Sequence, residues 1–168
     1  MLSIRPLMPA DVAQVLKINV EAQPNVAALD RVELTRLAEL SPTHIVAADG
    51  DAVCGYALIF GRDDEHDGEE FLALRSLISQ PFVYIDQVAV AGPVRSQGIG
   101  RRLYEALERS ASDRRISCLC CEVNTMPPNP GSLAFHARLG FSTLSCLATR
   151  DGRNVVLLEK RIIGATLT

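Results

Sequence analysis

The stretch Phe82–Leu107, FVYIDQVAVAGPVRSQGIGRRLYEAL, decides the fold of this chain. It opens with a run of mostly β-branched, aromatic and other apolar residues, which predicts a buried strand over 82–90. A turn with two glycines, Gly98 and Gly100, follows, and the apolar spacing after it predicts an amphipathic helix over 98–115. A strand that runs through a glycine turn into a helix is typical of α/β proteins.

The chemistry of this turn suits an anion. Glycines let the backbone turn tightly and approach a ligand closely, and a helix start presents N–H groups and a positive dipole end. Arg95, Arg101 and Arg102 add positive charge, although the chain carries a net charge of −3. A P-loop needs Gly-Lys-Ser/Thr, and a Rossmann turn needs three glycines at a first strand, so neither fits. The motif alone leaves two interpretations, a pyrophosphate cradle or a tight turn without a ligand.

The rest of the chain predicts a βααββ order followed by βαβαββ. Further strands are expected over 3–7, 43–49, 52–61, 116–124, 141–150 and 154–162, and further helices over 9–22, 31–40 and 131–140. Asp30 with Glu33 predicts a capping box at the start of the helix over 31–40. The strand–helix–strand order over 82–124 predicts two parallel neighbouring strands. We expect one α/β domain over residues 1–168, because no linker or repeat interrupts the pattern.

Composition limits the function classes. A net charge of −3 argues against a general nucleic-acid surface, and no apolar run is long enough to span a membrane. The start, MLSIRPLMPAD, lacks the pattern of a signal peptide, so a cytoplasmic protein is expected. Five cysteines are present, three of them in the expected strand ISCLCCEVN. We interpret them as small apolar residues of a reduced protein, and we expect no metal site.

An acidic segment separates the two halves of the pattern. Residues 62–71, RDDEHDGEEF, hold six acidic residues, and a helical turn is expected within 72–80. Two interpretations stay open for this segment. It is a solvated loop, or it is a lid whose field attracts a cationic substrate.

Three segments together resemble one family. The pattern V-A-V, a short loop, R-x-x-G-x-G and an amphipathic helix resembles the acetyl-CoA-binding motif of the GNAT superfamily of N-acetyltransferases. Asn129–Phe141, NPGSLAFHARLGF, is similar to the family's second CoA segment, N-x-x-A-x-x-x-Y-x-x-x-G-F. Ile4–Asp11, IRPLMPAD, is typical of its first strand and helix. The segments CEVN, PPNP and FHxxLGF look like those of a bacterial subgroup of acetyltransferases.

The resemblance implies a fold and a cosubstrate. The fold would be a mixed, mostly antiparallel sheet flanked by helices, with a central parallel strand pair splayed to hold CoA. The main chain of Val88 and Val90 would pair with the pantetheine arm of acetyl-CoA. The turn would hold the pyrophosphate through Arg95, Ser96, Gln97, Gly98, Ile99, Gly100 and Arg101. The second segment would contribute Asn129, Ser132, Phe135 and His136, and Asn129 also suits a helix N-cap because Pro130 follows.

The resemblance also implies direct acetyl transfer to a primary amine in a ternary complex. Because an alkylammonium has a pKa near ~10.4, a general base is needed at neutral pH. Glu122 is the first candidate base and Asp86 the second, although Glu122 could instead cap a strand or pair with an arginine. His136 stands where the family usually has a tyrosine that protonates the thiolate. Histidine can do the same, or it can be an ordinary helix residue.

The acceptor remains open between a cationic small molecule and a peptide amine. Tyr84, Phe82 and Phe71 could shape a pocket for an uncharged or aromatic amine. The alternative to an enzyme is a non-catalytic acyl-CoA-binding or regulatory module, which would bind CoA without turnover. Members of the family often form homodimers, sometimes by exchanging terminal strands, and the apolar strand over 154–162 suits that as well as burial in its own core.

Overall fold

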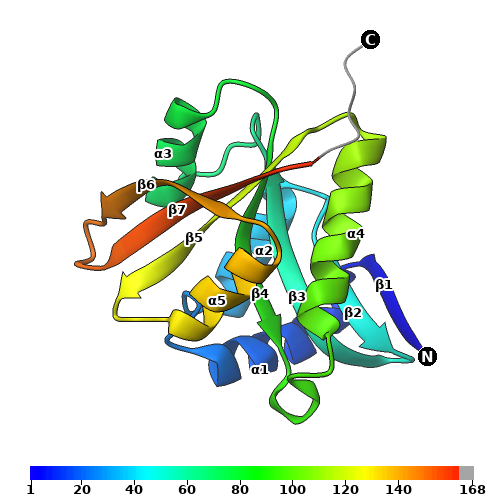
Figure 1. The fold of residues 1–168 in the computed structure, drawn as a ribbon. Coiled ribbons are helices and arrows are strands. Elements are labelled where there is room, and N and C mark those ends of the chain that lie inside the picture. Colours follow the sequence, from blue (N-terminus) through cyan, green and yellow to red (C-terminus); the bar gives the residue numbers. More distant parts are fainter. Residues whose placement is uncertain (163–168) are drawn as a thin grey trace. The chain divides into compact units, whose positions relative to one another are not determined.

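The computed structural model describes residues 1–162 and contains a seven-stranded sheet flanked by helices (Figure 1). The strands are β1 (Leu2–Pro6), β2 (Ile45–Asp49), β3 (Ala52–Gly61), β4 (Val83–Val90), β5 (Cys118–Met126), β6 (Ser142–Ala148) and β7 (Asn154–Arg161). The helices are α1 (Val12–Ala22), α2 (Arg31–Leu40), α3 (Glu69–Leu77), α4 (Ile99–Asp113) and α5 (Pro130–Arg138), with short 3-10 turns η1 (Pro9–Asp11) and η2 (Gly92–Val94). Apart from α3 and the two 3-10 turns, the element order is the predicted βααββ followed by βαβαββ.

The sheet has the order β1-β2-β3-β4-β5-β7-β6. β4 and β5 are parallel, with Val83–Ile85 opposite Leu119–Cys121, as α4 forms the crossover between them. The pairs β1–β2, β2–β3, β5–β7 and β6–β7 are antiparallel. The predicted α/β class, mixed sheet and parallel pair are therefore confirmed. β7 lies between β5 and β6, and its apolar residues Val155, Val156, Leu157 and Leu158 are buried there.

Residue contacts divide the chain into two compact units. Among the described residues, the first comprises 1–60 and 86–107, and the second comprises 61–85 and 108–162. β4 and α4 each contribute residues to both units.

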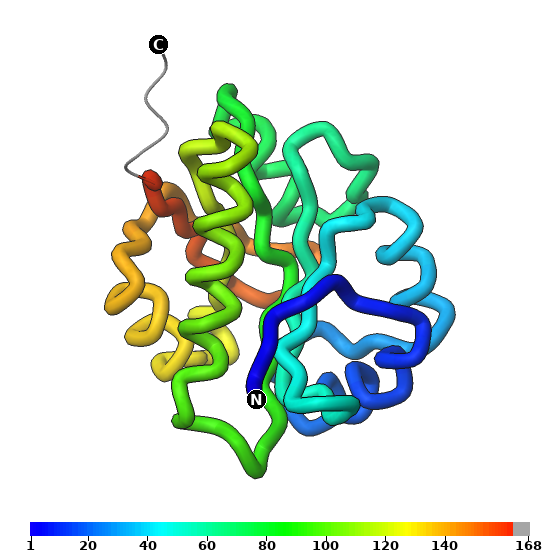
Figure 2. The backbone as a smooth tube through the Cα atoms, turned by 90° about the vertical axis from the view of Figure 1, so that its right-hand side faces the viewer, coloured from blue at the N-terminus to red at the C-terminus, as the bar shows by residue number. Residues whose placement is uncertain are grey.

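In the first unit, helices cover both faces of the strands (Figure 2). Ile99 and Leu103 of α4 form a buried cluster with Ala47 of β2, and Val88 and Val90 of β4 pack against it. The opposite face of the strands meets α1. This arrangement follows from the alternation of side chains along a strand.

In the second unit, α3 begins at Glu69, earlier than the sequence predicted. A helical turn was expected within 72–80, whereas the helix spans Glu69–Leu77. Glu69 and Glu70 therefore occupy its first turn, where carboxylates are favoured by the helix dipole. In the first unit, the Asp30 half of the predicted capping box of α2 is confirmed, because Asp30 Oδ1 accepts a hydrogen bond from the Glu33 N–H at 2.8 Å.

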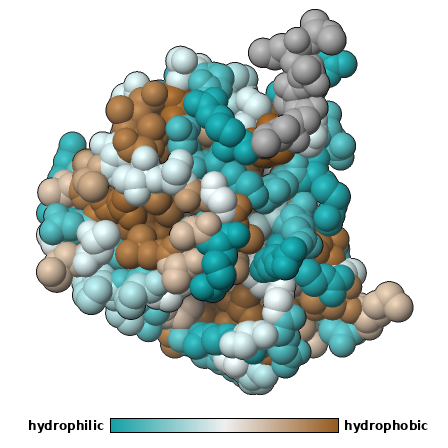
Figure 3. Space-filling model, in the orientation of Figure 1, coloured by the Kyte–Doolittle hydropathy of each residue, from teal (hydrophilic) through white to brown (hydrophobic). Residues whose placement is uncertain are grey.

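Some apolar side chains of the second unit stay exposed. Leu72 and Leu77 of α3 and Met126 of β5 are exposed. Figure 3 shows apolar surface in the part of the view where α3 and β6 lie. None of the helices in the described part of the chain is long and apolar enough to cross a membrane.

Candidate active site

The turn after β4 has the geometry of an anion site. Ser96 has φ 64° and Gly98 has φ 78°, so two left-handed residues curve the chain before α4. Arg102 donates the first intrahelical bond of α4, to the Gly98 carbonyl at 3.0 Å, so the N–H groups of Ile99, Gly100 and Arg101 have no intrahelical acceptor. A Cβ placed on Gly98 would meet no atom within 4 Å. The turn is therefore open on the side of Gly98.

The backbone N–H and C=O groups of β4 beside this turn point toward or away from β3 in a defined order. The Ala91 N–H donates to the Cys54 carbonyl of β3 at 2.9 Å, and the Ala89 carbonyl oxygen lies 2.9 Å from where a Cβ on Gly55 would be. Both groups therefore face β3. Because these groups alternate along a strand, the N–H and C=O of Val88 and Val90 face away from β3. They are the groups that were expected to pair with a pantetheine arm.

The arginines near the turn make contacts of their own. Arg95 donates from Nε to the Val90 carbonyl at 3.1 Å and from Nη2 to the Glu21 carbonyl at 3.3 Å. Arg101 pairs with Glu105 at 2.8 Å, and Arg102 reaches the Leu2 carbonyl at 3.0 Å. The positive charge expected at the turn is thus partly neutralised within α4. The Val90 carbonyl keeps a second lone pair that could accept from a ligand beside Arg95.

Helix α5 joins three of the predicted residues. The Asn129 side chain accepts a hydrogen bond from the Ser132 N–H at 3.3 Å, which confirms its N-cap role. His136 Nδ1 lies 2.8 Å from the Ser132 carbonyl oxygen, which can only accept, so Nδ1 carries the proton. The His136 ring is 3% exposed and edge-on to Phe135 and Phe141. Burial lowers the pKa of His136, so the neutral imidazole prevails at neutral pH.

The two candidate bases lie on neighbouring strands. Tyr84 of β4 lies opposite Cys120 of β5, and Glu122 follows Cys120 by two residues, so Glu122 and Tyr84 share a face of the sheet. The Oε2 atom of Glu122 is buried. Asp86 follows Tyr84 by two residues along β4 and points to the same side of that strand.

The expected pocket aromatics form a packed cluster. The rings of Phe71 and Tyr84 lie 5.4 Å apart, those of Phe71 and Phe82 lie 6.0 Å apart, and all three side chains are at most 1% exposed. Such burial favours a packing role for Phe71 and Phe82. His66 joins the cluster edge-on to Tyr84 at 5.6 Å, and its Nδ1 accepts from the Gly68 N–H at 2.9 Å. No pattern in the sequence indicated this contact, because His66 lies in an acidic segment without periodicity.

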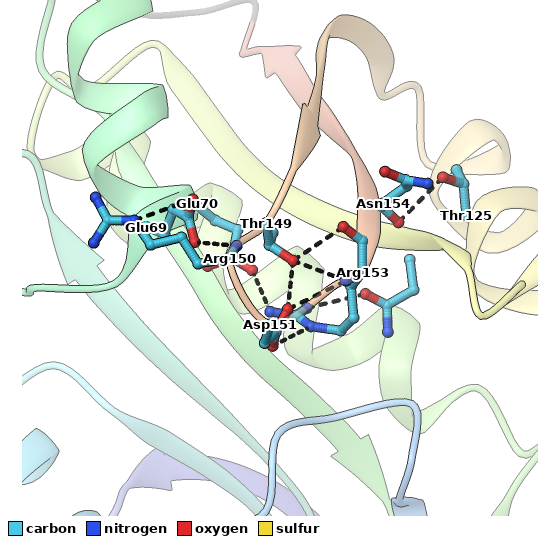
Figure 4. A network of polar contacts seen from close by, with 9 residues as sticks. Glu69, Glu70, Thr125, Thr149, Arg150, Asp151, Arg153 and Asn154 are labelled. Atoms are coloured by element: carbon cyan, nitrogen blue, oxygen red, sulfur yellow. Dashed lines mark hydrogen bonds and ion pairs between the residues drawn. The ribbon is translucent and has the colours of Figure 1, made fainter.

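Much of the acidic segment is engaged inside the second unit (Figure 4). Arg153 in the β6–β7 hairpin pairs with Glu70 at 2.7 Å and with Asp151 at 2.8 Å. The Arg150 N–H donates to Glu69 at 3.0 Å, and the Gly61 N–H donates to an acidic side chain, that of Asp64, at 2.7 Å. The segment therefore ties α3 to the hairpin. Its exposed acidic residues are Asp63, Glu65 and Asp67.

Three of the five cysteines are buried, as expected for small apolar residues, whereas Cys54 is partly buried and Cys146 is exposed. All five are free, and Cys118, Cys120 and Cys121 are buried. Burial raises the pKa of Cys118 to about 11. Among residues 1–162 no group of three His, Cys, Asp or Glu side chains is placed to hold a metal ion.

The mixed sheet, its parallel strand pair and the glycine turn at the start of α4 define a class of α/β protein suited to a phosphorylated cosubstrate. The chain belongs to the acetyltransferase (GNAT) family, whose model matches residues 13–141. It is therefore an N-acetyltransferase of a family that uses acetyl-CoA.

Solved structures share this fold. Ard1 from Thermoplasma volcanium has a TM-score of 0.77 at 17% identity, covering 96% of this chain and 98% of that chain. The ribosomal-protein-S18-alanine N-acetyltransferase of Escherichia coli has a TM-score of 0.70 at 18% identity, with coverages of 96% and 94%. The yncA protein of Salmonella typhimurium, solved with acetyl-CoA, has a TM-score of 0.70 at 18% identity, with coverages of 100% and 98%. No curated protein matches the chain.

Proposed function

We propose that residues 1–168 form one catalytic domain that transfers an acetyl group from acetyl-CoA to a primary amine in a single ternary complex. The main support for the proposal is that the backbone N–H and C=O groups of Val88 and Val90 face away from β3. They lie beside an open turn that contains left-handed residues. Val88 and Val90 would pair with the pantetheine arm, and the N–H groups of residues 95–101 would hold the pyrophosphate. The family match supports one domain, because it runs through both units.

Glu122 is the proposed general base, and Asp86 the second candidate. The burial of Glu122 Oε2 and the face that Glu122 shares with Tyr84 support this choice. The base takes a proton from the ammonium, directly or through water, so that the amine nitrogen can attack the thioester carbonyl. The new C–N bond forms, the nitrogen of the tetrahedral intermediate releases its second proton to solvent, and the C–S bond breaks with its electron pair leaving on sulfur. An N–H near Val88 would stabilise the oxyanion that forms.

The neutral state of His136 changes its proposed role. With Nδ1–H committed to Ser132, the imidazole has no spare proton for the thiolate. A thiol with a pKa near ~8.5 is a fair leaving group, so we propose that water protonates the thiolate. His136 and Asn129, with Ser132 and Phe135, would then contact the pantetheine arm from α5.

The acceptor is proposed to be a primary amine, with a peptide amino-terminus as the first candidate. The structural neighbour from Escherichia coli is named for acetylating the alanine of ribosomal protein S18. A polyamine is the second candidate, supported by the exposed acidic residues Asp63, Glu65 and Asp67.

The test is a thiol-release assay with acetyl-CoA and two probes, a peptide with a free N-terminal alanine and spermidine. Glu122→Gln should lower kcat roughly 10²-fold or more, within the range for loss of a general base. Glu159→Gln is the matched control, because Glu159 lies opposite Cys120 on the same face of β5–β7 and pairs with Arg161 at 3.4 Å. Its activity should stay close to that of the wild type.

The outcomes separate the alternatives. A larger loss in Asp86→Asn than in Glu122→Gln would assign the base to Asp86. Acetyl-CoA binding without turnover on any amine would favour the non-catalytic binding module.

A further inference from the structure

The first turn of α3 is attached to two neighbouring strands of the second unit. The Phe71 ring lies 5.4 Å from the Tyr84 ring of β4. Glu70, the residue before Phe71, pairs with Arg153 Nη2 at 2.7 Å, and Arg153 Nη1 donates to Asn124 Oδ1 of β5 at 3.1 Å. The turn is therefore attached to β4 by packing and to β5 through the guanidinium of Arg153 (Figure 4).

Glu122 lies between these two attachments. Tyr84 is opposite Cys120 in the parallel strand pair, so the packing contact is at the level of Cys120. Because side chains alternate along a strand, Cys120, Glu122 and Asn124 point to the same face of β5, about 7 Å apart in sequence order. The ion pair is at the level of Asn124. The first turn of α3 therefore spans the position of Glu122, in agreement with the burial of its Oε2 atom.

The ion pair that makes the second attachment is well fixed. Arg153 Nε also donates to Asp151 Oδ2 at 2.8 Å, so the guanidinium has three partners on three elements. Glu70 is 9% exposed. Breaking a pair with a buried partner is costly, because the remaining charge stays in a poorly solvated place. The sequence thus invests buried charge in holding α3 to the β6–β7 hairpin.

We propose that Glu70 and Arg153 are positioning residues, which keep the first turn of α3 over the carboxylate of Glu122. The proposal rests on the proposed function, in which Glu122 is the general base. A base must point at the proton that it removes, and a displacement of about 1 Å can lower a rate roughly 10²-fold. Because Glu122 as a whole is half-buried, the cover restrains one oxygen and leaves part of the residue accessible to the acceptor amine.

The test compares Arg153→Met and Glu70→Ala with a matched control, Arg150→Met. Arg150 is the other arginine of the hairpin turn, and it also faces α3, with Nε 4.0 Å from Glu69. Its side chain is 94% exposed, so this pair is a weak one and its loss should leave kcat at the wild-type value. Thermal unfolding checks that each variant is folded, and calorimetry measures its affinity for acetyl-CoA.

The expected change is in kcat, measured with whichever probe the wild type acetylates, the alanine peptide or spermidine. We expect kcat to fall about tenfold in Arg153→Met and in Glu70→Ala, because a loosened cover lets the base leave its productive orientation. Acceptor KM and acetyl-CoA affinity should stay at their wild-type values. Glu70→Gln keeps an oxygen that accepts from Arg153, so it should recover most of the lost kcat.

A double-mutant cycle with Glu122→Gln separates positioning from a merely structural role. If Arg153 acts through Glu122, Arg153→Met should cost no further activity once the base is absent. A tenfold loss that is the same with and without the Glu122 carboxylate would overturn the inference and leave the proposed function standing.

Hydrogen exchange at the Leu72 amide supplies a readout that does not need activity. This N–H donates to the Gly68 carbonyl at 3.0 Å and closes the first turn of α3. We expect faster exchange in Arg153→Met than in Arg150→Met. Faster exchange with wild-type kcat would overturn the inference alone. A wild type that acetylates neither probe, or a Glu122→Gln variant with wild-type kcat, would overturn the proposed function and the inference with it.

Discussion

The Nδ1 atom of His136 lies 2.8 Å from the carbonyl oxygen of Ser132, one turn earlier in α5. This single contact assigns the proton of a neutral imidazole to Nδ1, since a carbonyl cannot donate. Burial acts in the same direction, because it lowers the pKa of His136 from its usual value of 6.5. His136 is therefore an uncharged imidazole with its proton on Nδ1.

The lowered pKa of His136 predicts a pH dependence of stability. The unfolded chain binds a proton near pH ~6.5, whereas the folded chain resists it until a lower pH. The contribution of His136 is therefore fully present above about pH 6.5 and is lost as the pH falls. Urea unfolding of wild type and His136→Gln should show the wild type losing stability relative to the variant below that pH. Parallel pH profiles of the two proteins would contradict the burial argument.

Gly55 is predicted to tolerate no side chain. A Cβ there would lie 2.9 Å from the Ala89 carbonyl oxygen and 3.4 Å from Ile99. Because the carbonyl oxygen belongs to the sheet backbone, it can move away only by distorting the sheet. Gly55→Ala should lower the free energy of unfolding by about 2 kcal/mol, as overpacking does. Gly131→Ala is the control, because a Cβ there meets nothing within 4 Å and alanine favours the helix. Chemical denaturation of the two variants should give opposite signs.

The β6–β7 hairpin should weaken in acid. Hydrogen bonds from Thr149 and Arg153 lower the pKa of Asp151 to about 2. Because the folded pKa is depressed, the contribution of Asp151 is present above the unfolded value of ~3.9 and is lost as the pH falls through about 2. Asp151→Asn should therefore be less stable than wild type at neutral pH, and the difference should shrink below about pH 4. A difference that is constant with pH would show that the carboxylate charge plays no part.

The cysteines should divide into two groups by reactivity. Cys146 is exposed and Cys54 half-buried, whereas Cys118, Cys120 and Cys121 are buried and burial raises the pKa of their thiols. A thiol reagent should modify two residues in the native protein and all five after denaturation. Fast modification of a third thiol in the folded state would show that β5 is more accessible than its packing indicates.

The sequence predicted the elements because strand and helix periodicities were strong. The stretch Phe82–Leu107 contains the patterns of both the strand and the turn. The strand–helix–strand order over 82–124 predicted the parallel partner of β4. The start of α3 was missed because Glu69 and Glu70 read as part of an acidic loop. Only the packed structure shows that these carboxylates face Arg150 and Arg153 of a distant hairpin.

The polar residues of the core were harder to predict. Asn19 lies among the apolar positions of α1, and Gln87 interrupts an apolar strand. Each position therefore weakly indicates a buried polar side chain. Their hydrogen-bond partners, Ala27 and Leu29, are backbone groups of an irregular segment, which no side-chain pattern reveals. The protonation of His136 likewise depends on the Ser132 carbonyl and on burial, which only the folded structure shows.

The central claim is that the turn at Ser96–Gly98 holds the pyrophosphate of acetyl-CoA. Calorimetric titration with acetyl-CoA tests it most directly, with ATP and NAD as comparison ligands. Gly98→Glu places a carboxylate in the open space of the turn, and Gly50→Glu is the matched control, since Gly50 also has a positive φ and no atom within 4 Å. We predict micromolar binding by wild type and Gly50→Glu, and none by Gly98→Glu. Absence of acetyl-CoA binding to the folded wild type, or unchanged binding to Gly98→Glu, would contradict the account.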